Sequence, residues 1–190
     1  MPTGKPGNRP TRERRRQQQH ILLLTWTIWI ILLCSLAACS TGPTGDFAIY
    51  LLQGQLSGAE ILGVDPGHLL RQDQPLLTSQ DIIQYRPTRH QIELTEAAYK
   101  RIWEIFPTPI KTDGIPFVVT VGDQAIYAGA FWTPLSSISY NGVVILQPME
   151  PERRTIRIEL GYPSPEAFSD RDLRADPRIL DALQRSGKIK

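Results

Sequence analysis

The sequence predicts an α+β domain built on a largely antiparallel sheet. From residue 47 to residue 160, apolar segments of strand length recur, and several alternate polar and apolar residues as a half-buried strand does. Only two long segments after residue 45 show helical periodicity, so strands follow one another in runs, which is typical of this fold class. We therefore expect residues 46–190 to form a single domain with one central amphipathic helix and a C-terminal helix.

Most of the expected strands are short segments bounded by turn residues. Residues 47–52 form a continuous apolar run between two glycines, which predicts a buried strand. Residues 90–94 and 155–160 alternate, which predicts strands with one buried face. Residues 116–121 and 125–128 are expected to pair across a tight turn.

Two further hairpins are expected from turn signals. Asp65-Pro66-Gly67 favours a type II turn between residues 60–64 and 68–72, because proline fixes φ at the first central position and glycine allows a positive φ at the second. Asn141-Gly142 lies between two apolar segments, and this dipeptide is the strongest short hairpin signal.

The central helix is expected to begin after Thr95, a good N-cap residue that Glu96 follows in the first turn. Four apolar side chains then recur at helical spacing, and Pro107 ends the pattern. These side chains are Tyr99, Ile102, Trp103 and Phe106.

Two other helical signals occur on either side of this segment. Thr78-Ser79-Gln80-Asp81 resembles a capping box, with aspartate in place of the usual glutamate, and predicts a short helical turn over residues 82–85. Asp176 or Pro177 is expected to start the C-terminal helix, which would continue through Leu183 and end near Gly187.

The charge of the chain is unevenly distributed. The formal net charge is +2, but residues 1–38 hold six of the 21 Lys and Arg residues and one of the 19 Asp and Glu residues. Residues 39–190 are therefore net acidic, and because nucleic-acid-binding domains are usually basic, no nucleic-acid partner is expected. Charges of alternating sign at residues 170–178 predict a solvated, ion-paired surface.

Residues 12–39 show the order of an export signal. Charged residues at positions 12–16, four of them arginine, precede an apolar run from Ile21 to Leu33. Leu36-Ala37-Ala38-Cys39 follows. A basic segment, a short apolar segment and a small-residue cleavage site make up a secretory signal peptide. The ending Leu-Ala-Ala-Cys resembles the lipobox of bacterial lipoproteins.

The resemblance implies a lipid anchor at Cys39. Residues 1–38 would be removed by cleavage between Ala38 and Cys39, and Cys39 would carry a diacylglyceryl group and an amide-linked chain such as palmitate. Residues 39–45 would then be the acylated cysteine and a short tether. The implied location is the extracytoplasmic side of the cell membrane or envelope, where the partners would be membrane lipid and an envelope protein.

The alternative for this segment is an uncleaved span in a single-pass membrane protein. Residues 21–38 come near the lower limit of the ~20 residues that cross a bilayer. The arginines would stay on the cytoplasmic side in either case. The apolar run is shorter than a spanning helix, which favours the lipoprotein signal.

A second resemblance covers residues 76–146. A Leu-Thr-x-x-Asp sequence at residues 77–81, Glu93-Leu94-Thr95 at an expected helix start, and residues 117–123, a strand running into a tight turn, follow one another. This order resembles the first periplasmic domain of the SecD export protein. The resemblance supports an α+β fold and carries no implication for transport.

Few residues offer catalytic or metal-binding chemistry. A cell-surface hydrolase could use Ser136 or Ser137 as nucleophile with His90 as base, but no Gly-x-Ser-x-Gly elbow is present. Without such an elbow, no catalytic residue is expected. The sequence also lacks a P-loop, and no cofactor is expected. His68 and His90 lack the spacing of a zinc site, so no metal is expected either.

One aromatic segment is a candidate binding surface. It carries Tyr127, Phe131, Trp132 and Tyr140 among glycine, proline and serine residues. Aromatic side chains mixed with small polar residues are common on contact surfaces. The alternative is that these rings belong to the core. The sequence as a whole favours a lipid-anchored, extracytoplasmic module without catalytic activity, which would serve binding, assembly or another accessory role in the envelope.

Overall fold

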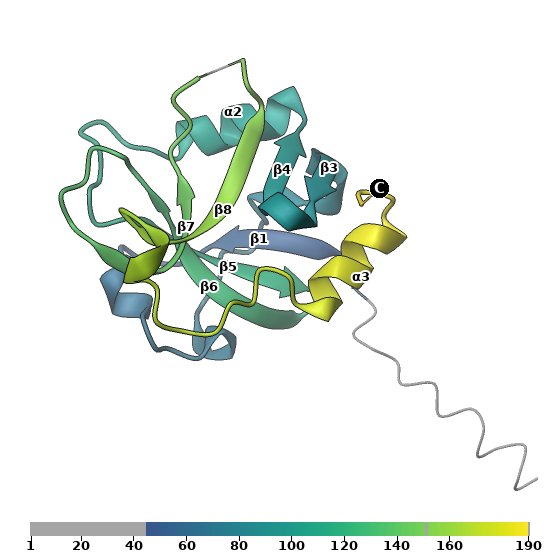
Figure 1. The fold of residues 1–190 in the computed structure, drawn as a ribbon, viewed down its shortest axis with the longest axis horizontal. Helices are drawn as coiled ribbons and strands as arrows, with labels where there is room; N and C mark the ends of the chain where they lie inside the picture. The colour runs from purple at the N-terminus through teal and green to yellow at the C-terminus, as the bar shows by residue number, and fades with distance from the viewer. Residues whose placement is uncertain (1–44, 151, 190) are drawn as a thin grey trace, which may run out of the picture. The chain divides into compact units, whose positions relative to one another are not determined.

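The computed structural model describes residues 45–150 and 152–189 (Figure 1). Its strands are β1 (Phe47–Leu51), β2 (Leu77–Thr78), β3 (Ile82–Arg86), β4 (Gln91–Leu94), β5 (Ile115–Val121), β6 (Gln124–Trp132), β7 (Tyr140–Leu146) and β8 (Thr155–Tyr162). Its helices are α2 (Glu96–Glu104) and α3 (Pro177–Arg185), with short 3-10 turns η2 (Ala59–Ile61), η3 (Pro66–His68), η4 (Ser79–Asp81), η5 (Pro87–Arg89) and η6 (Pro165–Ala167).

All of these strands belong to one eight-stranded sheet in the order β2-β1-β5-β6-β7-β8-β4-β3. Every neighbouring pair is antiparallel except β6 and β7, which are parallel. The predicted α+β class with a largely antiparallel sheet is therefore confirmed. Only the three residues of η4 separate the two edge strands β2 and β3 along the chain, so the two edges of the sheet lie close together at this junction.

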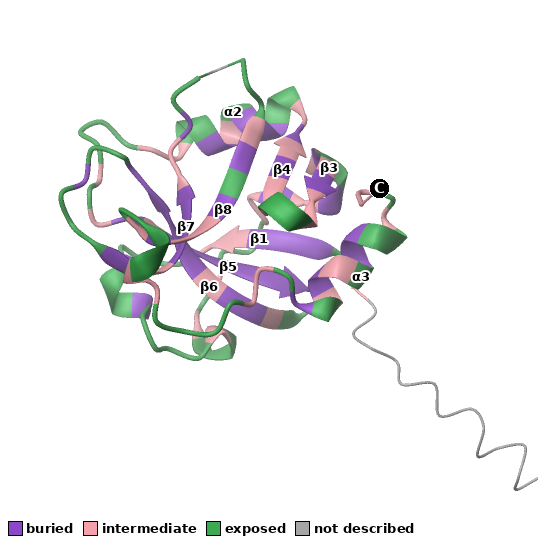
Figure 2. Ribbon diagram, viewed as in Figure 1, coloured by how far each residue is buried: buried purple, intermediate pink, exposed green. Residues whose placement is uncertain are grey.

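The inner face of the sheet holds the main hydrophobic core. Alternate residues of the strands meet there, and both helices bury one face in the same cluster (Figure 2). The helical contributions are Ala98, Tyr99 and Ile102 from α2 and Ile179, Ala182 and Leu183 from α3. Two smaller clusters lie apart from the main core, one around Trp132 and one around Val118, and loops rather than helices cover them.

Both predicted helix starts are confirmed. The Thr95 hydroxyl accepts a hydrogen bond from the backbone N–H of Ala98 at 3.3 Å, and the Asp176 carboxylate accepts one from Arg178 at 2.9 Å. Such N-caps satisfy backbone donors that the first helical turn leaves unpaired. One member of the predicted apolar stripe is not in the core, since Trp103 is 41% exposed.

The hairpin predicted over residues 60–72 is wrong. This segment forms the 3-10 turns η2 and η3 instead of strands. The Asp65 side chain accepts a hydrogen bond from the Gly67 N–H at 2.8 Å, and Gly67 has no positive φ, so the turn is not type II. Ile61 and Leu69 pack over β5 and β6, which explains the apolar residues that suggested strands.

The hairpin predicted at Asn141-Gly142 is also wrong, because both residues lie within the single strand β7. The ladder between β7 and β8 shifts register between Tyr140 and Val143. A Cβ atom on Gly142 would lie 2.6 Å from the Tyr140 ring. Glycine is therefore required here for close packing against an aromatic ring, not for a turn.

The capping box at Thr78 is confirmed, but the helical turn it starts is only η4, and residues 82–86 form strand β3. The Asp81 carboxylate accepts hydrogen bonds from the Thr78 N–H at 2.9 Å and hydroxyl at 3.1 Å. It also forms an ion pair of 2.6 Å with Arg101 of α2. Asp81 thus joins the edge of the sheet to a helix.

Within the described part of the chain, no helix is long and apolar enough to cross a membrane. The signal segment, the cleavage site at Ala38 and Cys39, and the proposed tether up to residue 44 lie outside the described residues. Their predicted roles stay predictions.

We predict that Asp81→Ala lowers the free energy of unfolding by about 1–3 kcal/mol, because it removes a capping interaction and a charged hydrogen bond. Urea unfolding of the full-length protein measures the change. Glu104→Ala is the control, since its 3.8 Å pair with Lys100 is exposed and contributes at most about 0.5 kcal/mol. Equal effects of the two substitutions would contradict the role given to Asp81.

Candidate functional site

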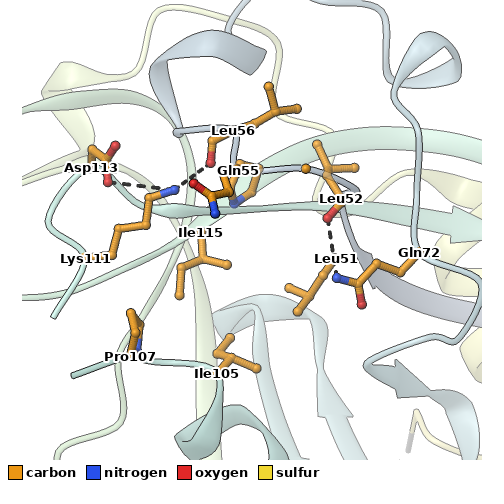
Figure 3. A pocket seen from close by; sticks show the side chains of 12 residues that line it. Leu51, Leu52, Gln55, Leu56, Gln72, Ile105, Pro107, Lys111, Asp113 and Ile115 are labelled. Atoms are coloured by element: carbon orange, nitrogen blue, oxygen red, sulfur yellow. Dashed lines mark hydrogen bonds and ion pairs between the residues drawn. The ribbon is translucent and has the colours of Figure 1, made fainter. Parts of the chain in front are cut away.

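A cleft of about 470 Å³ lies where β1 ends, beside the end of α2 and the start of β5 (Figure 3). We call it the β1 cleft. Its lining is mixed: seven apolar side chains and a glycine stand beside four amide or charged side chains, and polar atoms contribute more of the exposed surface than apolar atoms do. The lining residues are Leu51, Leu52, Gly54, Gln55, Leu56, Gln72, Ile105, Pro107, Lys111, Asp113, Ile115 and Pro116.

The cleft forms because the chain leaves the sheet at this point. After Leu51, the backbone N–H of Leu52 still bonds to Pro116 at 3.3 Å, but that of Gln53 bonds to Leu70 at 2.8 Å. Gly54 then turns the chain with a φ of 82°, which a residue with a Cβ atom rarely adopts. The space that β1 no longer fills is left open between β5 and the end of α2.

Polar groups lie around this apolar space. The Lys111 ammonium donates a hydrogen bond to the Leu56 carbonyl at 2.7 Å and lies 3.9 Å from the Asp113 carboxylate (Figure 3). Gln72 makes a long contact of 3.5 Å with the Leu52 carbonyl. A cleft that combines apolar side chains with hydrogen-bonding groups is a candidate ligand site.

The β1 cleft lies at the opposite end of β1 from the point where the described chain begins. Gly45 precedes the first residue of β1, and its carbonyl accepts a hydrogen bond from Arg185 at the end of α3. Asp46 bonds to Gly122 in the turn between β5 and β6. Any anchor upstream of Gly45 is therefore joined to the end of the domain that lies away from the cleft.

The predicted aromatic surface does not consist of exposed rings. Tyr127, Phe131, Trp132 and Tyr140 are between 0% and 4% exposed. Tyr127 and Phe131 belong to the main core. Trp132 and Tyr140 stack on each other in the smaller cluster, with ring centroids 4.8 Å apart. These four side chains therefore act in packing, and none of them forms an open contact surface.

The exposed apolar residues of this segment lie in the loop after Trp132. Leu135 is 66% exposed and Ile138 is 48% exposed. The loop is held by Ser136, whose hydroxyl donates to the Thr112 carbonyl at 2.7 Å and accepts from the Ile138 N–H at 3.1 Å. Ser136 therefore has a structural role in joining this loop to the one before β5.

Neither Ser136 nor Ser137 is hydrogen-bonded to His90 in the structure. Ser136 bonds to the loop before β5, Ser137 is exposed in the loop after β6, and the His90 ring contacts Tyr85 of β3. His68, the other histidine in the described chain, lies in η3. No group of three or more potential metal ligands occurs among residues 45–150 and 152–189.

His90 takes part in a closed circuit of hydrogen bonds that the sequence did not predict. Its carbonyl accepts from the Ile158 N–H at 2.9 Å, and the Ile158 carbonyl accepts from Arg174 at 2.8 Å. The Arg174 carbonyl accepts from the Tyr85 hydroxyl at 3.3 Å, and this hydroxyl lies 3.3 Å from His90 Nδ1. Arg174 also makes a two-pronged ion pair with Asp172 at 2.9–3.0 Å.

The circuit also affects the protonation of its members. The Tyr85 hydroxyl lies 3.3 Å from both the Arg174 carbonyl and His90 Nδ1, and it can donate its one proton to either of them. Burial, followed by the nearby Arg174 charge, lowers the pKa of His90, although Asp172 opposes the change. Burial also raises the pKa of Tyr85 to about 12. At neutral pH the cluster therefore holds a neutral imidazole and a neutral phenol.

The ion pairs predicted for residues 170–178 are confirmed. Asp172 pairs with Arg174, and Asp176 pairs with Arg178 at 2.8 Å, as alternating charges suggest. The surface is less solvated than predicted, because the Arg174 side chain is only 14% exposed.

Comparison with protein-family models, curated proteins and solved structures found no match to this chain.

We predict that Trp132→Ala lowers the free energy of unfolding by about 3–5 kcal/mol, because it empties a closely packed site against Tyr140. Leu135→Ala, three residues later, should change it by less than about 0.5 kcal/mol, since that side chain is exposed. Thermal and urea unfolding measure both. A stable Trp132→Ala protein would contradict the packing role of the aromatic cluster.

Proposed function

We propose that this chain is a lipid-anchored, extracytoplasmic binding module without catalytic activity, attached through Cys39 and serving an envelope-accessory or assembly role. The observation that carries the proposal is the position of the β1 cleft at the end of β1 away from Gly45. A domain held by a tether upstream of Gly45 would present this cleft away from the bilayer. The signal pattern of residues 12–39 supports the anchor.

The lining of the cleft favours an extended peptide segment of an envelope protein as the ligand. Leu51, Ile105 and Ile115 offer a surface for an aliphatic side chain. The amides of Gln55 and Gln72 each provide donors and acceptors, which match the N–H and C=O groups of a peptide backbone. The Lys111 charge is already shared by the Leu56 carbonyl and Asp113, so a strongly anionic ligand is not required.

A site-specific crosslinking experiment tests the proposal. A photoreactive benzophenone amino acid replaces Gln55 at the cleft, and the same amino acid replaces Gln124, an exposed glutamine at the start of β6, as the control. We expect irradiation of intact cells to give a discrete protein adduct at position 55 and none at position 124, because only position 55 lines the cleft.

The identity of the adduct completes the test. A peptide from one envelope protein, recovered at position 55 and lost when Ile115→Arg blocks the apolar surface of the cleft, would support the proposal. Equal labelling at both positions, or none at position 55, would contradict a binding role for the cleft. Folding of the Ile115→Arg variant is checked by circular dichroism.

A further inference from the structure

A second cleft, of about 540 Å³, lies beside the segment that connects β8 to α3. Residues 61–66 and 168–173 line two sides of it, and residues 126–128 of β6 and 140–143 of β7 line the rest. We call residues 168–176 the strap. Along the strap, only Leu173 and Phe168 are partly buried against the main core, whereas Ser169 and Asp170 are exposed.

Phe168 and Leu173 pack the strap against the core, and Arg174 joins it to the sheet by hydrogen bonds. The Arg174 side chain donates to Ile158 of β8, and its carbonyl accepts from Tyr85 of β3. Tyr85 in turn contacts His90. The Arg174 side chain also forms an ion pair with Asp172, which lies in the strap itself. Two strands, β8 and β3, thus hold the strap through the side chain and the backbone carbonyl of one residue.

A buried polar group of β6 lies next to this attachment. The Tyr127 hydroxyl is enclosed, and it has no hydrogen-bond partner in the described chain. Tyr127 lines the second cleft and is close enough to Arg174 and Asp172 for both charges to act on its pKa, which burial raises strongly. An unpaired buried hydroxyl costs roughly 1–3 kcal/mol. Movement of the strap would give this group access to a partner.

We propose that the strap is an acid-released cover, which opens the second cleft toward Tyr127 when His90 becomes protonated. The groups that face His90 are the Tyr85 hydroxyl from β3 and the Asp172 and Arg174 charges from the strap, while β8 meets it through the backbone of Ile158. An imidazolium at His90 is repelled by the charge of Arg174 more strongly than it is attracted by the charge of Asp172. Repulsion between the two cations acts on the side chain that joins the strap to the sheet.

The direction of the pH effect follows from proton linkage. Burial and Arg174 lower the pKa of His90 in the fastened state more than Asp172 raises it. Opening of the strap would weaken all three influences, so the pKa of His90 would rise toward its usual value. The open state therefore binds the proton more tightly, and acidification favours it as the pH falls below the usual histidine pKa of about 6.5. Hydrogen bonds from Arg174 lower the pKa of Asp172 in the fastened state. Protonation of Asp172 therefore also favours the open strap, but only at a more acidic pH than protonation of His90.

Amide hydrogen exchange of the full-length, detergent-extracted protein tests the proposal. Between about pH 7.5 and about pH 5.5, we expect protection of the strap, corrected for intrinsic exchange rates, to fall by a factor of about two to five, while protection of α2 stays constant. His90→Asn should abolish this pH response. Asparagine tolerates the left-handed backbone of His90, where φ is 47°, and its amide can hydrogen-bond to Tyr85 in place of Nδ1.

Two further variants distinguish the effect of His90 on the strap from a general loss of stability. His68→Asn removes the other histidine of the described chain and should leave the pH response of the strap unchanged. Arg174→Lys should lower strap protection already at neutral pH, since lysine cannot reproduce the paired contacts with Asp172 and Ile158. An unchanged wild-type strap at low pH, or an equal pH response in His90→Asn, would overturn the proposal.

Discussion

The fold depends on the closure of the sheet at η4. Three residues separate the edge strands β2 and β3, and Asp81 holds that junction through Thr78 on one side and Arg101 on the other. The backbone carbonyl of Asp81 also accepts a hydrogen bond from the N–H of Thr95, the cap of α2. Burial raises the pKa of Asp81, but the hydrogen bonds from Arg101 and Thr78 outweigh it, so the carboxylate stays ionised in its network.

Closure of the sheet explains where the clefts lie. The inner face is filled by side chains of strands and both helices, and Leu51, Ile105 and Ile115 of the β1 cleft pack against the edge of this core. Openings occur where a loop leaves a strand, as at the end of β1, or runs beside one, as the strap does beside β6. Both clefts therefore result from loop paths beside strands that are paired in the sheet.

Local signals explain which features could be predicted from the sequence. Capping at Thr95 and Asp176, and the strands with clear apolar patterns, depend on residues close in sequence. The error at Asn141-Gly142 arose because glycine there accommodates a neighbouring ring, and the parallel pairing of β6 with β7 depends on contacts that no local pattern encodes. The same holds for the candidate sites, since the β1 cleft and the His90 circuit join residues far apart in the sequence.

The proposed function depends on an anchor at Cys39, which would join the membrane to the chain upstream of Gly45. The most direct measurement is the intact mass of protein extracted from the native membrane, beside a Cys39→Ala variant. We predict a mass that lacks residues 1–38 and carries acyl chains, and an unacylated, uncleaved variant. A full-length wild-type mass without lipid would contradict the account and would make residues 21–38 a membrane span.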